Sequence, residues 1–170
     1  HYLDAFGGGH FDGKPELVYT LVNKAPSVIK WLNDLGVEFD KEADGTMVTT
    51  HGGGTSRKRM HACKDYSGAE IMRTLRDEVL NRPDKITVID FTAAIEIIKD
   101  DKGNACGAVL MNVETNEIRI AKAKVVIIAT GGAGRMHYQG FPTSNHYGAT
   151  ADGLVIAYRA GAKLLYQDSL

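Results

Sequence analysis

The fold is decided by the stretch Val125-Val126-Ile127-Ile128-Ala129-Thr130-Gly131-Gly132-Ala133-Gly134. Its apolar, largely β-branched first half is too short for a buried helix and is typical of a strand buried on both faces, so we expect it inside a parallel sheet. The Thr-Gly-Gly at its end permits a turn with positive φ and leaves no side chain where a ligand approaches. Ligands of open α/β sheets bind at such carboxyl ends of strands, although an ordinary tight turn is the alternative.

Length and composition narrow the class of protein. The chain has 170 residues, a formal net charge of −1 and 44% apolar residues, which predicts one globular domain without the basic field of a nucleic-acid binder. No apolar run approaches the roughly 18 residues of a membrane span, so we expect neither a membrane span nor a signal peptide. Cys63 and Cys106 form no CxxC pair, so we expect reduced cysteines and a cytoplasmic location.

Hydrophobic periodicity predicts helices, followed by strands. A three- and four-residue repeat indicates a helix from Pro15 to Gly36, with a kink or a break near Pro26. Ser67 and Glu70 read as a capping box that starts a second helix. From Ile86 the period changes to two, which is typical of strands. The expected strands are 86–90, an antiparallel meander of 94–99, 106–113 and 118–120, and the run at 125–128, with a last helix at 152–160.

Seven short segments are informative through their order and spacing along the chain. They are His1-Tyr2-Leu3-Asp4, Arg59-Met60-His61-Ala62, Asp65-Tyr66-Ser67-Gly68, Ala129-Thr130-Gly131-Gly132-Ala133-Gly134-Arg135, Thr143-Ser144-Asn145, Gly148-Ala149-Thr150-Ala151-Asp152-Gly153 and Arg159-Ala160-Gly161-Ala162. Together they resemble the FAD-dependent flavoprotein family of succinate dehydrogenase, fumarate reductase and L-aspartate oxidase. The likeness extends over essentially the whole chain and is nearest to the L-aspartate oxidase branch.

The resemblance implies an α/β fold class, as part of a glutathione-reductase-like FAD-binding fold. Such a fold combines parallel sheet strands, a three-stranded antiparallel meander and flanking helices. Residues 1–170 then correspond to a partial FAD-binding domain, an internal fragment without the N-terminal Rossmann element or the C-terminal substrate and capping parts. The run Gly131-Gly132-Ala133-Gly134 does not fit the GxGxxG fingerprint of that element, so we expect the fragment to hold FAD weakly or not at all.

The resemblance also implies which residues touch the cofactor. It places the backbone of Ala129, Thr130 and Gly131, with Gly132 beside them, over the adenosine end of FAD. It places Ala93 and Ala94 against the adenine through backbone hydrogen bonds. Asp152 matches the Asp of a Gly-Asp-Gly motif that accepts bonds from flavin-side hydroxyls, with Ala151 in place of the first Gly and therefore a stiffer turn. The alternative for Asp152 is a helix N-cap that satisfies its own first turn.

No catalytic or metal-binding residue is expected in the chain. The six histidines show no HxxxH spacing and no pairing with cysteines, which argues against zinc. His137 and His146 flank the loop after the key strand and are the better candidates for lining a cleft, with plain loop structure as the alternative. The resemblance puts the His-Pro-Thr stretch and the arginine proton shuttle of the family downstream of Leu170.

Two functions remain open from the sequence. In the first, the parent protein is an FAD-dependent oxidoreductase that exchanges hydride between flavin N5 and a dicarboxylate, either fumarate/succinate or L-aspartate, while the isolated segment is inactive and self-associates. In the second, the chain is a stand-alone α/β module that binds a nucleotide or a protein. Within the first, a soluble oxidase and a flavoprotein subunit held at the cytoplasmic membrane by an iron–sulfur partner are both possible.

Overall fold

The chain forms two compact units in a computed structural model that describes residues 1–136 and 144–166. The first unit is His1–Val88 and the second is Ile89–Leu170. Every residue from 81 to 91, around the boundary between the units, is exposed. In the described ranges, no helix is long and apolar enough to cross a membrane.

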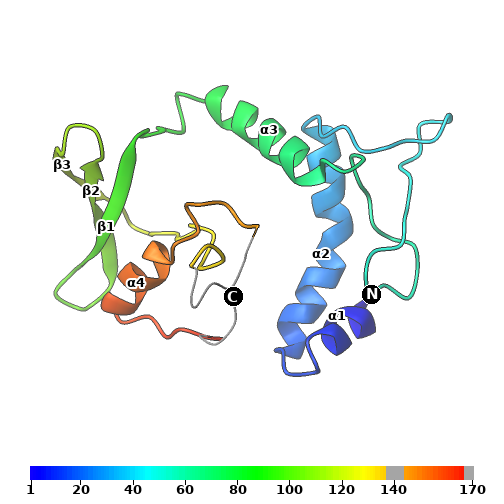
Figure 1. Cartoon of the computed structure of the whole chain (residues 1–170), viewed down its shortest axis with the longest axis horizontal. Coiled ribbons are helices and arrows are strands. Elements are labelled where there is room, and N and C mark those ends of the chain that lie inside the picture. The colour runs from blue at the N-terminus through cyan, green and yellow to red at the C-terminus, as the bar shows by residue number, and fades with distance from the viewer. Residues whose placement is uncertain (137–143, 167–170) are drawn as a thin grey trace. The chain divides into compact units, whose positions relative to one another are not determined.

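Three helices build the first unit: α1 (Tyr2–Gly8), α2 (Pro15–Asp34) and α3 (Ser67–Leu80) (Figure 1). Pro15 starts α2 at a position where a missing N–H costs nothing, and Pro26 lies inside an otherwise continuous helix. The predicted break near Pro26 is therefore not a division into two helices. The buried core of this unit consists of Leu32, Val37, Phe39 and Cys63.

The predicted capping box at the start of α3 is wrong. The Ser67 hydroxyl accepts a hydrogen bond from the Cys63 N–H at 3.0 Å, and Glu70 accepts one from the Glu38 N–H at 3.2 Å. Neither side chain bonds the first turn of α3, and the residue before the helix makes no side-chain cap either. Both oxygens instead tie α3 to loops that a local sequence pattern does not reveal.

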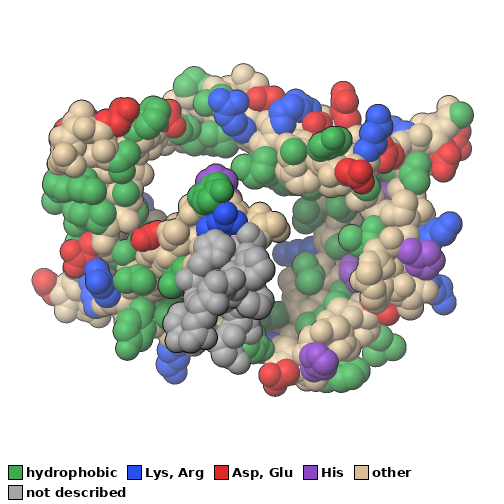
Figure 2. All heavy atoms as spheres, viewed as in Figure 1, with side chains coloured by type: hydrophobic (Ala, Val, Ile, Leu, Met, Phe, Trp, Pro, Cys, Tyr) green, Lys and Arg blue, Asp and Glu red, His purple; other side chains and the backbone are tan. Residues whose placement is uncertain are grey.

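An antiparallel meander forms the sheet of the second unit. Its strands are β1 (Thr92–Lys99), β2 (Ala105–Asn112) and β3 (Ile118–Lys122), in the order β1-β2-β3, as the alternating pattern predicts. A bulge at Ile95 interrupts the pairing of β1 with β2. A short helix, α4 (Asp152–Arg159), lies beside β1 (Figure 1). Hydrophobic side chains gather on the surface over β2 and β3 (Figure 2).

The two predicted parallel strands are not present among the described residues. Residues 86–89 have no regular structure, and neither has the run at 125–128. Val125 is 71% exposed and Ile127 is 84% exposed, and Val126 between them is only half-buried, so the run is not buried on both faces as predicted. The physical reason is that a strand requires a partner backbone, and no described strand pairs with this run. The hydrophobicity of residues 125–128 predicts that they are buried, but it does not provide the neighbouring strand with which they would pair.

Candidate functional site

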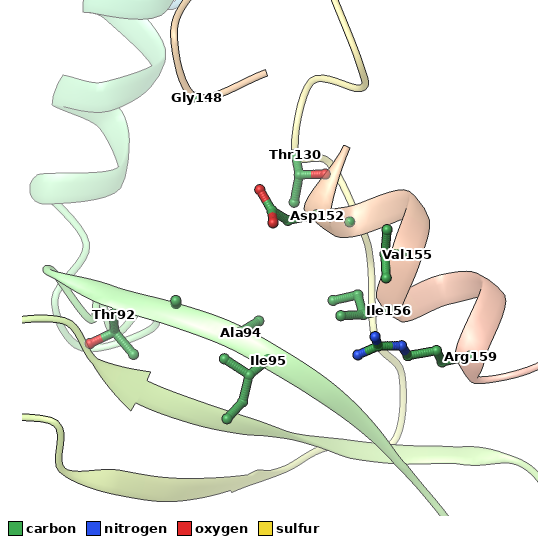
Figure 3. Close-up of a pocket in the computed structure, with 11 residues that line it drawn as sticks. Thr92, Ala94, Ile95, Thr130, Gly148, Asp152, Val155, Ile156 and Arg159 are labelled. Atoms are coloured by element: carbon green, nitrogen blue, oxygen red, sulfur yellow. The ribbon is translucent and has the colours of Figure 1, made fainter. Parts of the chain in front are cut away.

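A cavity of about 620 Å³ opens between α4 and β1, within the range of about 300–1,000 Å³ that is usual for small-molecule sites. Both walls belong to the second unit. The lining residues are Thr92, Ala93, Ala94, Ile95, Thr130, Gly148, Asp152, Gly153, Val155, Ile156 and Arg159. Figure 3 shows Asp152 at the start of α4 and Arg159 in its last turn, with Val155 and Ile156 between them.

Helical spacing explains why α4 presents these four side chains together. Relative to Asp152, they stand at positions i, i+3, i+4 and i+7, which share one face of an α-helix. The polarity of this helix face therefore changes along its length. It has a carboxylate at one end, two aliphatic side chains in the middle and a guanidinium at the other end. The Ile156 side chain is buried, whereas those of Asp152 and Arg159 are exposed.

Asp152 is not the N-cap of α4. The cap position is Ala151, with no side-chain capping bond, and Asp152 is the first helical residue. The Thr150 hydroxyl donates a hydrogen bond to Asp152 Oδ2, which orients the carboxylate. The positive end of the helix dipole also favours the negative charge at this point. The helix-cap alternative for Asp152 is therefore wrong, and Asp152 lines the cavity.

Ala151 adopts an unusual backbone conformation just before this carboxylate. Its φ is 69° and its ψ is 8°, in the left-handed region that glycine occupies without cost. Its N–H donates to the Gly132 carbonyl at 3.0 Å, which fastens the start of α4 to the turn after Thr130. Gly131 and Gly132 also have positive φ, at 86° and 81°, as the Thr-Gly-Gly pattern predicts.

Gly153 brings Thr130 against the first turn of α4. A Cβ on Gly153 would lie 1.9 Å from Thr130 Oγ1 and 2.9 Å from Ile128 Cγ2, so only glycine fits. The Thr130 hydroxyl and the Asp152 carboxylate consequently line the same cavity, although they stand 22 positions apart in the sequence. This close approach gives the cavity its polar end.

The structure brings together four of the seven residues that the sequence singles out, namely Ala93, Ala94, Thr130 and Asp152. Ala129, Gly131 and Gly132 flank Thr130 but do not line the cavity. Ala93 and Ala94 lie in β1, opposite Met111 and Leu110 of β2. In the described sheet β1 has one neighbour, so half of its backbone polar groups point away from β2.

Sequence reasoning missed Gly153 and Arg159. The available signals were a glycine inside the first turn of a predicted helix and an arginine seven residues after Asp152 on the same face. Of the two histidines proposed for the cleft, His146 does not line it, and its Nδ1 accepts a hydrogen bond from the Gly148 N–H at 2.9 Å. His137 lies outside the described residues.

Comparisons with known proteins agree with the resemblance in the sequence. An uncharacterized FAD-dependent oxidoreductase of Methanocaldococcus jannaschii is 38% identical over 167 residues, which is 97% of this chain and 30% of that protein. An L-aspartate oxidase of Vibrio cholerae is 33% identical over 175 residues, covering 96% of this chain and 32% of that protein. The chain thus spans about a third of the length of these relatives.

A solved structure of a quinol-fumarate reductase with menaquinol molecules matches with a TM-score of 0.87 and 28% identity. The match covers 95% of this chain and 27% of that chain. The family model described as an FAD binding domain matches residues 1–170, the whole sequence. The chain therefore belongs to the FAD binding domain family.

Proposed function

We propose that this chain is part of the FAD-binding domain of a flavin-dependent oxidoreductase that acts on a dicarboxylate, either fumarate/succinate or L-aspartate. The observation that carries the proposal is the cavity beside α4 in a chain of this family, with a carboxylate and a hydroxyl converging at one end. The names of the relatives support the substrate class, because one is an L-aspartate oxidase and another a fumarate reductase.

The residues at the cavity fit one half of a dinucleotide. Asp152 and Thr130 offer oxygens to sugar or ribityl hydroxyls, and Ile95, Val155 and Ile156 offer apolar surface to a ring. Ala93 and Ala94 lie in a strand with an open edge, which leaves backbone groups for hydrogen bonds to a ring edge. When bound, FAD would supply hydride exchange at flavin N5.

In this proposal the chain binds and orients the cofactor but contributes no catalytic residue. Asp152 holds a hydroxyl, and Ala93 and Ala94 hold the adenine through their backbone. Ala129, Thr130, Gly131 and Gly132 lie along the adenosine half. Since the substrate-binding histidine and the proton-donating arginine are expected elsewhere, the chain alone should not reduce fumarate with a reduced viologen.

The complete protein is proposed to contain the missing partner of the exposed run at 125–128. Pairing there would give the parallel sheet of a glutathione-reductase-like fold and would bury Val125 and Ile127, which are exposed in this chain. An iron–sulfur subunit is a proposed partner, because a quinol-fumarate reductase is among the structural matches. Such a partner would hold the protein at the surface of the cytoplasmic membrane.

The test removes the carboxylate at the polar end of the cavity. Titration of the flavin-free whole protein with FAD, followed by flavin fluorescence, should show about tenfold weaker binding for Asp152→Ala, because a hydrogen bond to a charged group is worth about 1.5 kcal/mol or more. Asp101→Ala is the matched control, since Asp101 is an exposed aspartate in the β1–β2 turn, away from the cavity. It should bind FAD like the unmodified protein.

Thermal unfolding of both variants separates a local loss of binding from a loss of fold. Unchanged FAD affinity for Asp152→Ala, in a variant that melts like the unmodified protein, would contradict the assignment of this cavity to the cofactor.

A further inference from the structure

Arg159 occupies the end of the cavity opposite to Asp152, and it also lines an adjoining cavity of about 300 Å³. Figure 3 shows its side chain reaching from the last turn of α4 toward β1 instead of away from the sheet. The guanidinium thus lies where the two cavities meet. A ligand that extends along α4 from Asp152 would reach it.

The usual structural roles of an arginine at a helix C-terminus do not account for this position. No ion pair within residues 1–136 and 144–166 includes Arg159. The Ala160 carbonyl at the end of α4 already accepts a hydrogen bond from Lys99 Nζ at 3.2 Å. The guanidinium therefore has donors and a planar face to offer to a ligand.

Along α4, the lining of the cavity changes from a group that can bind hydroxyls to groups that can pack on a ring. A nucleoside has the same order, with a hydroxylated sugar followed by a flat base. Asp152 and Arg159 are seven residues apart, a rise of about 10 Å along the helix. The carboxylate end suits hydroxyl donors, and the middle, between Ile95 and Ile156, suits the face of a flat ring. A guanidinium at the far end stacks well on a heteroaromatic ring, because it is planar, charged and weakly hydrated.

We propose that Arg159 is a positioning residue that stacks its guanidinium on the ring of the dinucleotide half whose hydroxyls bond Asp152. The inference rests on the proposed function, because it takes FAD as the ligand. The ring is a planar heteroaromatic system attached to a hydroxylated chain, which describes both the adenosine half and the flavin half of FAD. Arg159 closes the cavity over that ring and lengthens the residence of the cofactor.

The experiment measures three affinities of the flavin-free whole protein: for FAD directly, and for ADP and FMN by competition with FAD. Arg159→Ala should weaken FAD binding about fivefold, which is the usual strength of a partly exposed cation–π contact. Arg159→Lys should weaken it similarly, because lysine keeps the charge but loses the planar face. Arg76→Ala is the matched control, because Arg76 is an exposed arginine on α3 that lines neither of the two cavities beside α4.

The two smaller probes separate the two sources of the ring. A loss confined to ADP supports stacking on the adenine, and a loss confined to FMN supports stacking on the flavin. Equal losses for ADP and FMN, with a lowered melting temperature, would assign Arg159 a merely structural role and overturn the proposal. Unchanged FAD binding by Arg159→Ala, or full binding by Arg159→Lys, would also overturn it. Because Asp152→Ala tests the site itself, a loss there without a loss at Arg159 refutes the stacking alone.

Discussion

Ala151 is strained by its left-handed backbone, and this gives a prediction about a single methyl group. An L-residue in this conformation costs about 1–2 kcal/mol, whereas glycine adopts it freely. Replacement of Ala151 by glycine should therefore stabilise the protein by about 0.5–1 kcal/mol, because the greater freedom of glycine in the unfolded chain offsets part of the gain. The measurement is the urea midpoint of the variant against the unmodified protein.

Ala157 provides the matched control for this substitution. It lies inside α4, where glycine is less favourable than alanine by about 1 kcal/mol. Ala157→Gly should therefore lower the urea midpoint while Ala151→Gly raises it. If both variants were destabilised alike, the strain at Ala151 would not be real.

Single residues of the site were predictable only where a local pattern carried the information. Thr130 and the positive φ of Gly131 and Gly132 follow from a Thr-Gly-Gly that ends an apolar run. Arg159 was missed although it stands seven residues after Asp152 on the same helical face, because an arginine near a helix end is ordinary in a sequence. It becomes informative once β1 is known to lie beside α4.

Asp4 connects α1 to the loop that precedes α3, and its ionisation makes this connection sensitive to pH. Its carboxylate accepts hydrogen bonds from the Ser56 N–H at 2.8 Å, the Ser56 hydroxyl at 3.0 Å and Arg59 Nη1 at 2.6 Å. The Ser56 backbone bond and then the Arg59 guanidinium lower the pKa of Asp4 from its usual 3.8 to about 2. The folded state therefore favours the charged carboxylate.

The contribution of Asp4 to stability should be complete above its usual pKa of 3.8 and should disappear as the pH falls to about 2. Melting temperatures of the unmodified protein and of Asp4→Asn, measured from pH 6 to pH 2, should differ at pH 6 and converge toward pH 2. The difference between the two melting temperatures cancels the effect of other carboxylates on the pH dependence. One of these is Glu70, whose pKa is also lowered to about 2 by the Arg73 guanidinium. A difference that is constant across this range would contradict the role of Asp4.

Whole elements were predictable where periodicity was enough, and failed where a distant partner decided the outcome. The amphipathic repeats located α2, α3 and α4, and the alternation located all three strands of the meander. The capping box failed because Ser67 and Glu70 bond residues in other segments. The parallel strand at 125–128 does not form because pairing depends on a neighbour, not on the hydrophobicity of the run itself.

The molecule as a whole exposes apolar surface that water disfavours, and this predicts its behaviour in solution. Val125 and Ile127 are 71% and 84% exposed, and on β3 Ile118 and Ile120 are 55% and 64% exposed. We expect the isolated chain to self-associate through the run at 125–128, and Ile127→Lys to reduce that association. Light scattering over a range of concentrations gives the mass of both proteins.

Thr87→Lys is the control for the added charge, because Thr87 is an exposed polar residue outside the run. It should associate like the unmodified chain. A monomeric mass for the unmodified chain at high concentration would contradict the expectation.

The family of the whole chain was predictable from the sequence. The order of its short segments indicated the flavoprotein family, and the match to the FAD binding domain model covers residues 1–170.

The bulge at Ile95 makes the β1 wall of the cavity sensitive to the number of residues in the strand as well as to their identity. Ala94 pairs with Leu110 and Glu96 with Val109, so Ile95 is the extra residue on β1. Deletion of Ile95 would leave Ala94 opposite Leu110 and Glu96 opposite Val109, so that this part of β1 would pair with β2 without a bulge. Substitutions along β1 change the cavity one side chain at a time, whereas the loss of this one codon would remove Ile95 from the cavity lining and also change the course of the strand beside α4.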